Sequence, residues 1–492
     1  MNLADLLTES AARHGDRTAI RQEGIALSYT GLERATALVA GFLRSHGVRP
    51  GDAVGLMLPN VIYFPVCYYG ALRAGAAIVP MNILLKEREV AYYMSDSGAR
   101  VLFAWHQFAD AARAGAHDAE VVVVEPGAFD ALLAGCHGAA TIDRVPDDTA
   151  VILYTSGTTG KPKGAELTHG NLSENAAVAR ELFDLGPEAV TLGTLPLFHA
   201  FGQTCALNTT LAAGGTLELL PRFDAGKALE IIEDDRVTIF EGVPTMYSAM
   251  LHHPGDFDTS SLQICVSGGA AMPVEVLRAF EQRFECTILE GYGLSETSPV
   301  VSFSRRDRVR KPGSIGLPVR GVEMELVDVH DGVGEIVVRG HNVMKGYWND
   351  PEATAKAIDP EGWFHTGDLA RVDDDGYYFI VDRKKEMIIR GGFNIYPREI
   401  EEVLHEHPAV MDAAVVGIPH DELGEEVGAA VVLRPGAEVT TEDIRAFVKA
   451  RVAAYKYPRS VWFLDSLPKG ATGKVLRRDI KPPAPVQTPA AR

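Results

Sequence analysis

Residues 154–164 read YTSGTTGKPKG, and they follow directly on the apolar run Ala150–Leu153. An apolar run of this length is typical of a buried strand, so we expect the loop at the end of a strand. Its glycines, serine and threonines expose backbone N–H groups and hydroxyls that can surround phosphate oxygens, and Lys161 and Lys163 add positive charge. A Walker A loop is excluded, because that motif has Ser or Thr after its Lys and here Pro162 follows Lys161. The stretch predicts a different phosphate-binding loop, one that binds a triphosphate.

Short apolar runs alternate with helix-like segments on both sides of this loop. In the first third of the chain a helical pattern covers Tyr63–Arg73, and the β-rich runs are Ala53–Leu58, Ala77–Pro80, Val101–Trp105 and Glu120–Val124. Beyond the loop a helix, a strand and a helix are predicted, in that order, at Ala228–Asp234, Val237–Phe240 and Pro273–Phe284. Such alternation is typical of βα units around a largely parallel sheet, so the sequence predicts an α/β fold.

The chain changes character near residue 380. Short strands and Asp/Gly turns indicate hairpins around Gly334–Arg339 and Gly376–Val381. A small α+β domain is predicted from two helices and two strands, at Arg398–Glu406, Thr441–Ala453, Ala413–Gly417 and Ala429–Leu433. We therefore expect an N-terminal domain over residues 1–381, a C-terminal domain over 382–480 and a Pro/Ala-rich disordered tail over 481–492.

The composition limits the class of protein. The 492 residues hold 47 basic and 66 acidic side chains, a net charge of −19, and 46% of them are hydrophobic. That is too apolar for a disordered polyanion and too acidic for a nucleic-acid binder, which collects Lys and Arg on one face. The five cysteines form no CxxC pair, and Asp5 and Glu9 stand where a signal peptide needs positive charge. We expect a cytoplasmic protein without a membrane span, because Arg73 and several glycines interrupt the apolar stretch Val61–Met81.

Four more motifs follow the loop in order. They are GYGLSET at 291–297, TGD at 366–368, DRKKEMIIRGGFNIYPREIE at 382–401 and PKGATGKVLRRDI at 468–480. Together with the loop they resemble the adenylate-forming superfamily of acyl-CoA synthetases, peptide-synthetase adenylation domains and firefly luciferase, over nearly the whole chain. The resemblance implies a large N-terminal region of two α/β subdomains plus a distorted β-barrel, followed by a small mobile α+β domain.

The resemblance also implies a reaction in two steps. A carboxylate attacks the α-phosphorus of ATP to give an acyl-adenylate and pyrophosphate, and CoA then takes the acyl group while AMP leaves. Cations and a metal ion must neutralise the phosphate charge during the first step. The implied cofactors are therefore ATP, Mg²⁺ and CoA.

The motifs assign the residues that bind ATP. Glu296 is the implied Mg²⁺ ligand together with Thr155, and both count among the implied catalytic residues. Tyr292 is expected to stack on adenine, and Asp368, assisted by Arg383, to accept hydrogen bonds from the ribose hydroxyls. The other residues expected to bind ATP or AMP are Ser156, Gly157, Thr158, Thr159, Gly160, Lys163, Gly269, Ala270, Gly291, Gly293 and Thr297.

The C-terminal motifs imply a second set of roles. Lys474 resembles the catalytic lysine of the family, which brings a cation to the α-phosphate, whereas we expect Arg477 and Arg478 to form a solvated basic face. Asp382 resembles the hinge about which the small domain swings after adenylation. The residues expected to bind CoA in the second state are Lys385, Gly391 and Gly392.

The acid is predicted from the positions that form the acyl pocket. These are Phe198, His199, Phe201, Gly242, Val243, Met246, Gly268 and Val300, of which His199 is also implied in catalysis between the acyl tunnel and the CoA path. Amino acids are disfavoured, because the peptide-synthetase adenylation domains that the chain resembles bind the amino group with an Asp in the corresponding segment, and Pro196–Gln203 has no acidic residue. Malonate is disfavoured because malonate-type synthetases have an Arg where Gly291 stands. Gly242, Gly268 and Gly269 leave room for a tunnel, which favours a medium- or long-chain fatty acid.

Other readings stay open. An aryl acid of the 4-coumarate type also fits an uncharged pocket, and a luciferase-type oxidase shares the motifs. A non-catalytic acyl-binding module is disfavoured because Glu296 and Lys474 are both present. The expected partners are a small carboxylic acid and CoA, with transient contact with a membrane surface for a lipid substrate and no nucleic acid, and the protein is expected to be a monomer or a homodimer.

Overall fold

The computed structural model describes residues 1–155, 161–391, 393–420, 422–470 and 473–483. The chain divides into two compact units. The first consists of Met1–Met272, Ala279–Glu325 and Val337–Thr366, and the second of Pro273–Arg278, Leu326–Ile336 and Gly367–Arg492. The predicted hinge at Asp382 falls inside the second unit, and the boundary at that residue stays a prediction. Residues 484–492 of the predicted disordered tail lie outside the described part of the chain.

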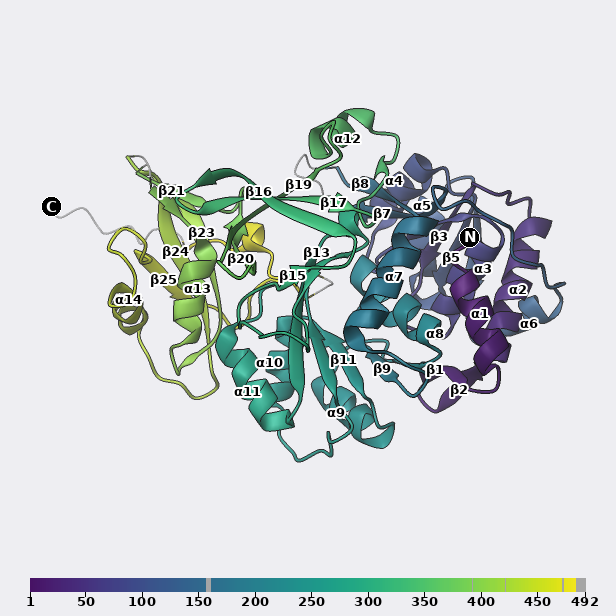
Figure 1. The fold of residues 1–492 in the computed structure, drawn as a ribbon, viewed down its shortest axis with the longest axis horizontal. Helices are drawn as coiled ribbons and strands as arrows, with labels where there is room; N and C mark the ends of the chain where they lie inside the picture. Colours follow the sequence, from purple (N-terminus) through teal and green to yellow (C-terminus); the bar gives the residue numbers. More distant parts are fainter. Residues whose placement is uncertain (156–160, 392, 421, 471–472, 484–492) are drawn as a thin grey trace. The chain divides into compact units, whose positions relative to one another are not determined.

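A seven-stranded sheet occupies the N-terminal part of the first unit (Figure 1). In sheet order its strands are β18 (Gly346–Tyr347), β8 (Lys163–Thr168), β7 (Thr149–Thr155), β4 (Ala77–Pro80), β3 (Ala53–Met57), β5 (Val101–Trp105) and β6 (Glu120–Val124). The strands from β7 to β6 run parallel, as the βα alternation predicts, and β8 and β18 are antiparallel additions. The accompanying helices are α2 (Tyr29–Ser45), α3 (Tyr63–Arg73), α4 (Glu87–Ser97), α5 (Ala109–Gly115), α6 (Ala128–Ala134) and α12 (Pro351–Ala357), with the 3₁₀ turn η1 (His106–Phe108).

A nine-stranded sheet forms the rest of the first unit. In sheet order its strands are β15 (Leu317–Pro318), β14 (Val300–Phe303), β13 (Thr287–Gly293), β12 (Ile264–Ser267), β11 (Ile239–Gly242), β9 (Val190–Gly193), β10 (Thr216–Leu219), β1 (Thr18–Gln22) and β2 (Ile25–Ser28). The strands from β13 to β1 are parallel, so their carboxyl ends share one edge of the sheet. The helical segments are α1 (Asp5–His14), α7 (His169–Phe183), π-helical η2 (Gly202–Asn208), α8 (Thr209–Ala213), α9 (Ala225–Asp234), α10 (Pro244–His252), α11 (Val274–Phe284) and η3 (Ser295–Thr297).

The apolar stretch around residue 70 is a buried helix. Every residue of α3 is buried, including Tyr68 and Tyr69, which explains why this helix is apolar all round. Arg73 at its end is accommodated by an ion pair with Glu33 at 2.6 Å. Within the described residues, none of the helices combines the length and the apolar character needed to cross a membrane.

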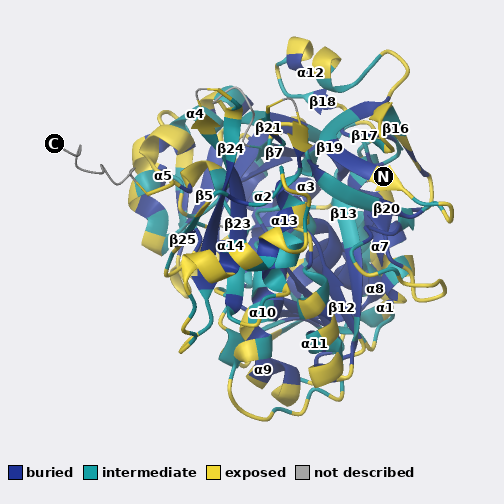
Figure 2. Cartoon of the chain, turned by 90° about the vertical axis from the view of Figure 1, so that its left-hand side faces the viewer, coloured by how far each residue is buried: buried dark blue, intermediate teal, exposed yellow. Residues whose placement is uncertain are grey.

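A four-stranded and a five-stranded sheet follow in the sequence. The four-stranded sheet has the order β16 (Val322–His330), β17 (Val333–Gly340), β19 (Phe364–Val372) and β20 (Tyr378–Arg383). The five-stranded sheet has the order β22 (Phe393–Ile395), β21 (Ile388–Arg390), β24 (Gly424–Leu433) and β23 (Val410–His420), with β25 (Ser460–Phe463) also paired to β24. Helices α13 (Pro397–His405) and α14 (Thr441–Lys449) and the turn η4 (Arg477–Asp479) complete this region. In Figure 2 α14 turns an exposed face outward, while much of β23 is buried.

The predicted elements are present and the α/β class is confirmed. Boundaries differ at several elements. Strand β11 lies two residues later than predicted, β23 is three residues longer at each end, and β24 begins at Gly424 rather than Ala429. The helix α14 ends at Lys449 rather than Ala453. The chain tightens there, because the N–H of Arg451 donates to the carbonyl of Val448, three residues back, instead of continuing the α-helical pattern. The strands β16, β17, β19 and β20 form a four-stranded sheet with two free edges among the described residues, and the distorted β-barrel stays a prediction.

Candidate active site

The predicted phosphate loop connects two strands of the seven-stranded sheet. Thr155 is the last residue of β7, and it pairs in antiparallel register with Lys163, the first residue of β8. Two paired strands therefore hold the residues at both ends of the loop. Five predicted ATP-binding residues of the loop lie outside the described residues, namely Ser156, Gly157, Thr158, Thr159 and Gly160.

Thr155 and Glu296 come together as the motifs imply. The Thr155 hydroxyl donates to Glu296 Oε1 at 3.2 Å, and the Tyr347 hydroxyl donates to the same oxygen at 3.1 Å. Burial, together with Glu296, raises the pKa of Tyr347, so this phenol stays protonated and remains a donor. The ammonium of Lys163 lies 5.1 Å from the centre of the Tyr347 ring, a distance suited to a cation–π contact.

These oxygens fit a magnesium ion. Mg²⁺ needs few protein ligands, because it keeps several waters and takes phosphate oxygens from its substrate. The hydroxyl of Thr155 and the carboxylate of Glu296 supply two hard oxygens at one point. Elsewhere in the described residues, no group of three or more His, Cys, Asp or Glu side chains could hold a metal ion.

Glycines shape the strand that carries Tyr292. A Cβ on Gly293 would lie 1.7 Å from the carbonyl oxygen of Pro299, and a Cβ on Gly291 would lie 2.4 Å from the Phe303 ring. At Gly293 only glycine therefore lets β13 pair with β14, whereas at Gly291 a side chain would require the Phe303 ring to move. The sequence predicts no cation at residue 291, and in the structure the Phe303 ring occupies the space that a side chain at this residue would take.

The residues expected around adenine differ in exposure. Gly269, at a φ of +77°, and Ala270 are exposed just after the end of β12, where a flat base could approach the backbone. Tyr292 is half-buried. Thr297 is fully buried, and its hydroxyl donates to the carbonyl oxygens of Leu294 and Pro299 at 3.0 and 2.8 Å. The Thr297 hydroxyl is thus engaged in holding its own turn.

Asp368 and Arg383 are partners across the β19–β20 hairpin. The two residues are paired in register, and Arg383 Nε lies 2.9 Å from Asp368 Oδ1. Asp368 is only 3% exposed. A buried carboxylate held in a fixed direction by a guanidinium is well suited to accept hydrogen bonds from two neighbouring hydroxyls.

Lys474 lies half-buried in the same unit. Burial, and the neighbouring cation Arg383, lower the pKa of Lys474 to about 8, while Glu386 and Asp368 act in the opposite direction. The turn that presents it is closed by the N–H of Gly470, which donates to the Lys474 carbonyl at 2.8 Å. At neutral pH the amine is mostly protonated and can serve as a cation.

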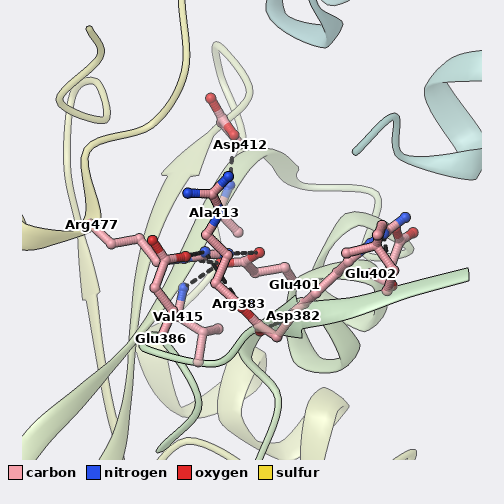
Figure 3. Close-up of polar contacts among 11 residues, drawn as sticks. Asp382, Arg383, Glu386, Glu401, Glu402, Asp412, Ala413, Val415 and Arg477 are labelled. Carbon is pink, nitrogen blue, oxygen red and sulfur yellow. Dashed lines mark hydrogen bonds and ion pairs between the residues drawn. The ribbon is translucent and has the colours of Figure 1, made fainter. Parts of the chain in front are cut away.

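Three residues further on, Arg477 does not lie on a solvated basic face as predicted but among acidic side chains (Figure 3). Its guanidinium binds Glu401 with two hydrogen bonds, of 2.6 and 3.2 Å, and also pairs closely with Glu386. It lies 3.9 Å from Asp382 as well. The expectation was wrong for Arg477 and right for Arg478, whose side chain is 76% exposed. Arg477 therefore ties the segment that carries Lys474 to α13 and to the end of β20.

Asp382, the predicted hinge, is buried inside this cluster. Its carboxylate accepts hydrogen bonds from the backbone N–H groups of Arg383 at 2.7 Å and Arg398 at 3.1 Å. Burial raises the pKa of Asp382 to about 6, although Arg477 and the two N–H groups act to lower it. Asp382 is therefore a buried carboxyl group and not part of a surface ion pair.

The predicted CoA-binding residues lie near the β21–β22 hairpin. Lys385 is exposed, and Gly391 has a φ of +56° with its N–H bonded to the carbonyl of Leu423 at 2.8 Å. Gly392 lies outside the described residues. The neighbouring Arg390 binds Glu426 with two hydrogen bonds, of 2.6 and 3.0 Å, which fixes the turn end of β21 to β24.

The predicted acyl-pocket residues gather where η2 meets the carboxyl ends of β11 and β12. His199 lies in the turn that enters η2, and its Nδ1 accepts from the N–H of Phe201 at 3.3 Å. A Cβ on Gly268 would lie 3.0 Å from the Phe201 ring, and a Cβ on Gly242 would lie 2.9 Å from the Phe240 ring. Aromatic rings therefore fill the space beside two glycines that were expected to leave a tunnel. The remaining predicted residues of the pocket are Phe198, Val243, Met246 and Val300, all of them partly or fully buried.

Comparison with known proteins identifies the family of the chain. Residues 7–348 match the AMP-binding enzyme family, and residues 399–474 match the AMP-binding enzyme C-terminal domain. The chain belongs to the AMP-binding enzyme family.

Named relatives of this AMP-binding enzyme are similar over nearly their whole length. It is 39% identical to a long-chain-fatty-acid–CoA ligase of Bacillus subtilis, over 97% of this chain and 93% of the relative. It is 40% identical to a feruloyl-CoA synthase of an Amycolatopsis species, over 94% of this chain and 95% of the relative. The structure is similar to that of ATP-bound MatB from Rhodopseudomonas palustris, with a TM-score of 0.91, 34% identity and coverage of 97% and 98% of the two chains.

Three residues of this AMP-binding enzyme were missed by sequence reasoning. Tyr347 lies outside every motif on a two-residue strand, and Arg477 is one of two adjacent arginines that the pattern does not distinguish. Glu241 is an acidic residue within β11, where it is fully buried. Its position in an otherwise apolar strand was the one signal that could have drawn attention to it.

Proposed function

We propose that this enzyme activates an organic acid that carries no second charge, and transfers it to CoA. The protein is an AMP-forming acid–CoA ligase that uses ATP and CoA as substrates, as its family and its acyl- and aryl-CoA ligase relatives indicate. The observation that supports an uncharged acid is the pocket wall. Val243 and Met246 are buried there, Phe201 covers Gly268, and the Phe303 ring takes the place of a side chain at residue 291.

Two acid classes fit this wall. Medium- or long-chain fatty acids are our first candidate, because each buried CH₂ contributes roughly 0.8 kcal/mol against an apolar surface. The fatty-acid relative from Bacillus subtilis supports that choice. Aryl acids are the second candidate, supported by the feruloyl-CoA synthase relative and by the rings of Phe201, Phe240 and Tyr247, which limit the space beside Gly268 and Gly242.

For the adenylation step we propose the following roles. Thr155 and Glu296 would hold Mg²⁺, which would neutralise phosphate charge when bound. Lys474 supplies a cation to the α-phosphate and the attacking carboxylate, and Asp368, held by Arg383, accepts hydrogen bonds from the ribose hydroxyls. Tyr347 holds the Glu296 carboxylate through its 3.1 Å hydrogen bond.

For the thioester step we propose a second set of residues. Asp382 is the hinge, Lys385 and the Gly391–Gly392 loop bind CoA, and His199 lies between the acyl group and the thiol. A buried Asp382 that accepts two backbone N–H groups fixes the chain one residue before β20 ends, and a hinge concentrates its change of dihedral angles at such an element end. The proposal keeps the predicted cytoplasmic location, the monomer or homodimer, and transient contact with a membrane surface for a lipid acid.

The test is a CoA-dependent assay of AMP release with octanoate, palmitate, 4-coumarate, malonate and acetate. We expect turnover with a fatty acid or with 4-coumarate and little with malonate or acetate. Strong preference for 4-coumarate would replace the first candidate by the second. Activity restricted to malonate would contradict the interpretation of Gly291, and light or peroxide output without a thioester would contradict the ligase.

A further inference from the structure

One buried carboxyl group in the first unit, that of Glu241, has none of the roles described above. Glu241 is fully buried in β11, and neither of its carboxylate oxygens has a hydrogen-bond partner among the described residues. A buried polar group without a partner is costly, so native proteins seldom keep one without a reason. Burial alone raises the pKa of Glu241 to about 8, so at neutral pH the group is mostly a neutral carboxylic acid. Such a group can both donate and accept a hydrogen bond.

The backbone places Glu241 at the edge of the sheet where ligands bind. It is the second-last residue of β11, which ends at Gly242. The parallel neighbour β12 ends beside it, at Ser267. In open parallel sheets, ligands occupy the crevice outside the carboxyl ends of the strands. The Thr194 hydroxyl donates to the Glu241 carbonyl at 2.9 Å and fixes the backbone at this end.

Glu241 pairs in register with Val266, so its side chain lies on the same face of the sheet as position 268, the face that meets Phe201. Cys205 of η2 lies near Glu241. The pKa of the Cys205 thiol is raised first by the burial of the thiol and second by the negative charge of the Glu241 carboxylate. Phe201, four residues earlier and so on the same face of this helix, faces Gly268, because a Cβ built on that glycine would lie 3.0 Å from the Phe201 ring. The helical segment formed by Phe201 and η2 therefore faces both Glu241 and Gly268, which places the carboxyl group beside the predicted acyl pocket.

Two further unpartnered groups lie in the same region. Gln203 Nε2 on η2 and Ser267 Oγ at the end of β12 are each in residues only 1% exposed, and neither has a partner within the described part of the chain. The three groups come from the three elements that bound the predicted pocket. An apolar acyl chain would leave all of them unpaired, whereas an acyl group that carries its own oxygen would pair with at least one.

We propose that Glu241 is a specificity-determining residue that hydrogen-bonds a hydroxyl or carbonyl group on the acyl part of the acid. The inference rests on the proposed function. It separates the candidate acids by whether the acyl part carries an oxygen, rather than by whether it is aryl or aliphatic. Hydroxylated or oxo acids, whether aryl or aliphatic, are preferred over the same acids without the oxygen. The site discriminates because a buried carboxyl left unpaired by the wrong acid costs binding free energy.

The experiment compares acids that differ by a single hydroxyl. The pairs are 4-coumarate with cinnamate and 10-hydroxydecanoate with decanoate, and kcat/KM is measured by CoA-dependent AMP release. The wild type should prefer the hydroxylated member of at least one pair by roughly tenfold. Glu241→Leu should reduce that preference to within about twofold, whereas Glu241→Gln, which still donates and accepts, should keep most of it.

A matched control is available in the same sheet. Glu218 on β10 is also buried and its Oε2 likewise has no hydrogen bond among the described residues, but that oxygen forms an ion pair with Arg21 at 3.5 Å. Arg21 keeps a second partner in Asp235. Glu218→Leu should therefore leave the preference between paired acids unchanged. The proposal is overturned if the wild type shows no preference in either pair, or if Glu241→Leu keeps the full preference. Absence of thioester with every acid would overturn the ligase as well, so the two failures are distinguishable.

Discussion

Two buried carboxyl groups in different parts of the chain have opposite surroundings. Asp382 accepts two backbone N–H groups and lies beside Arg477. Glu241 has neither a donor nor an acceptor among the residues that the structure describes. Burial raises both pKa values, to about 6 for Asp382 and about 8 for Glu241. The difference is what our proposal rests on: the first carboxyl group is satisfied by the protein itself, and the second is the one we propose to pair with a ligand.

The largest effect is expected in the region of Asp382, where the chain presents Lys474. Lys474→Ala should lower acid-dependent ATP–pyrophosphate exchange by about 10²–10³-fold, because it removes a cation that stabilises charge developing on the phosphate. Thioester formation from supplied acyl-adenylate should survive. An equal fall of both half-reactions would show that the lysine is structural or that the small domain does not alternate between two states.

The cluster itself should be sensitive to the loss of its cation. Arg477→Leu leaves Glu386, Glu401 and Asp382 close together with no guanidinium between them. We expect the free energy of unfolding to fall by about 2–3 kcal/mol, measured by urea denaturation. Arg478→Leu is the matched control, because that side chain is 76% exposed, and it should change stability by less than about 0.5 kcal/mol. Equal effects of the two variants would remove the structural role assigned to Arg477.

The charge on Lys474 gives a pH prediction. Because its pKa is lowered to about 8, the amine is charged below that pH and neutral above it. The value of kcat/KM for ATP in the exchange reaction should therefore fall about tenfold per pH unit above pH 8, since this ratio reports the free enzyme. Lys474→Arg keeps its charge in this range, so whatever activity it retains should not show the fall. A flat wild-type profile from pH 7 to 10 would contradict a catalytic cation at this residue.

The smallest effect is expected at Glu241, and its sign is opposite to that at Arg477. Glu241→Leu should raise the free energy of unfolding by about 1 kcal/mol, because it removes an unpaired polar group from an apolar site. The gain should increase from pH 5 to pH 8. In that range the unfolded chain loses the Glu241 proton while the folded wild type keeps it, so the wild type loses stability as the pH rises. A decrease in stability, measured by urea denaturation at pH 5 and pH 8, would show that the carboxyl group has partners of its own.

The sequence predicted the elements better than the surroundings of single side chains. The alternation of apolar runs located β3 to β7 and α3, and the motifs brought Thr155 and Glu296 together although they lie far apart in the chain. Arg477 was misread because two adjacent arginines look alike in a sequence. Which of them turns inward depends on the turn η4 and on Glu401, which comes from a different element.

Sequence reasoning missed Glu241 for a related reason. An acidic residue in a short strand normally indicates a face that meets solvent. Here η2 covers that face, and a helix from another part of the chain is not visible in the local pattern. The same applies to the glycines, since only the folded chain shows that Phe201 and Phe240 occupy the space beside Gly268 and Gly242.

The most direct test of the account measures acid-dependent ATP–pyrophosphate exchange side by side in the wild type, Lys474→Ala and Glu241→Leu, with 4-coumarate and cinnamate. The account predicts that Lys474→Ala lowers exchange with both acids by the same large factor, because the lysine acts on the phosphate that both reactions share. Glu241→Leu should instead reduce only the difference between the two acids. Undiminished exchange in Lys474→Ala, or an equal loss with both acids in Glu241→Leu, would contradict the separation of the two regions into catalysis and acid selection.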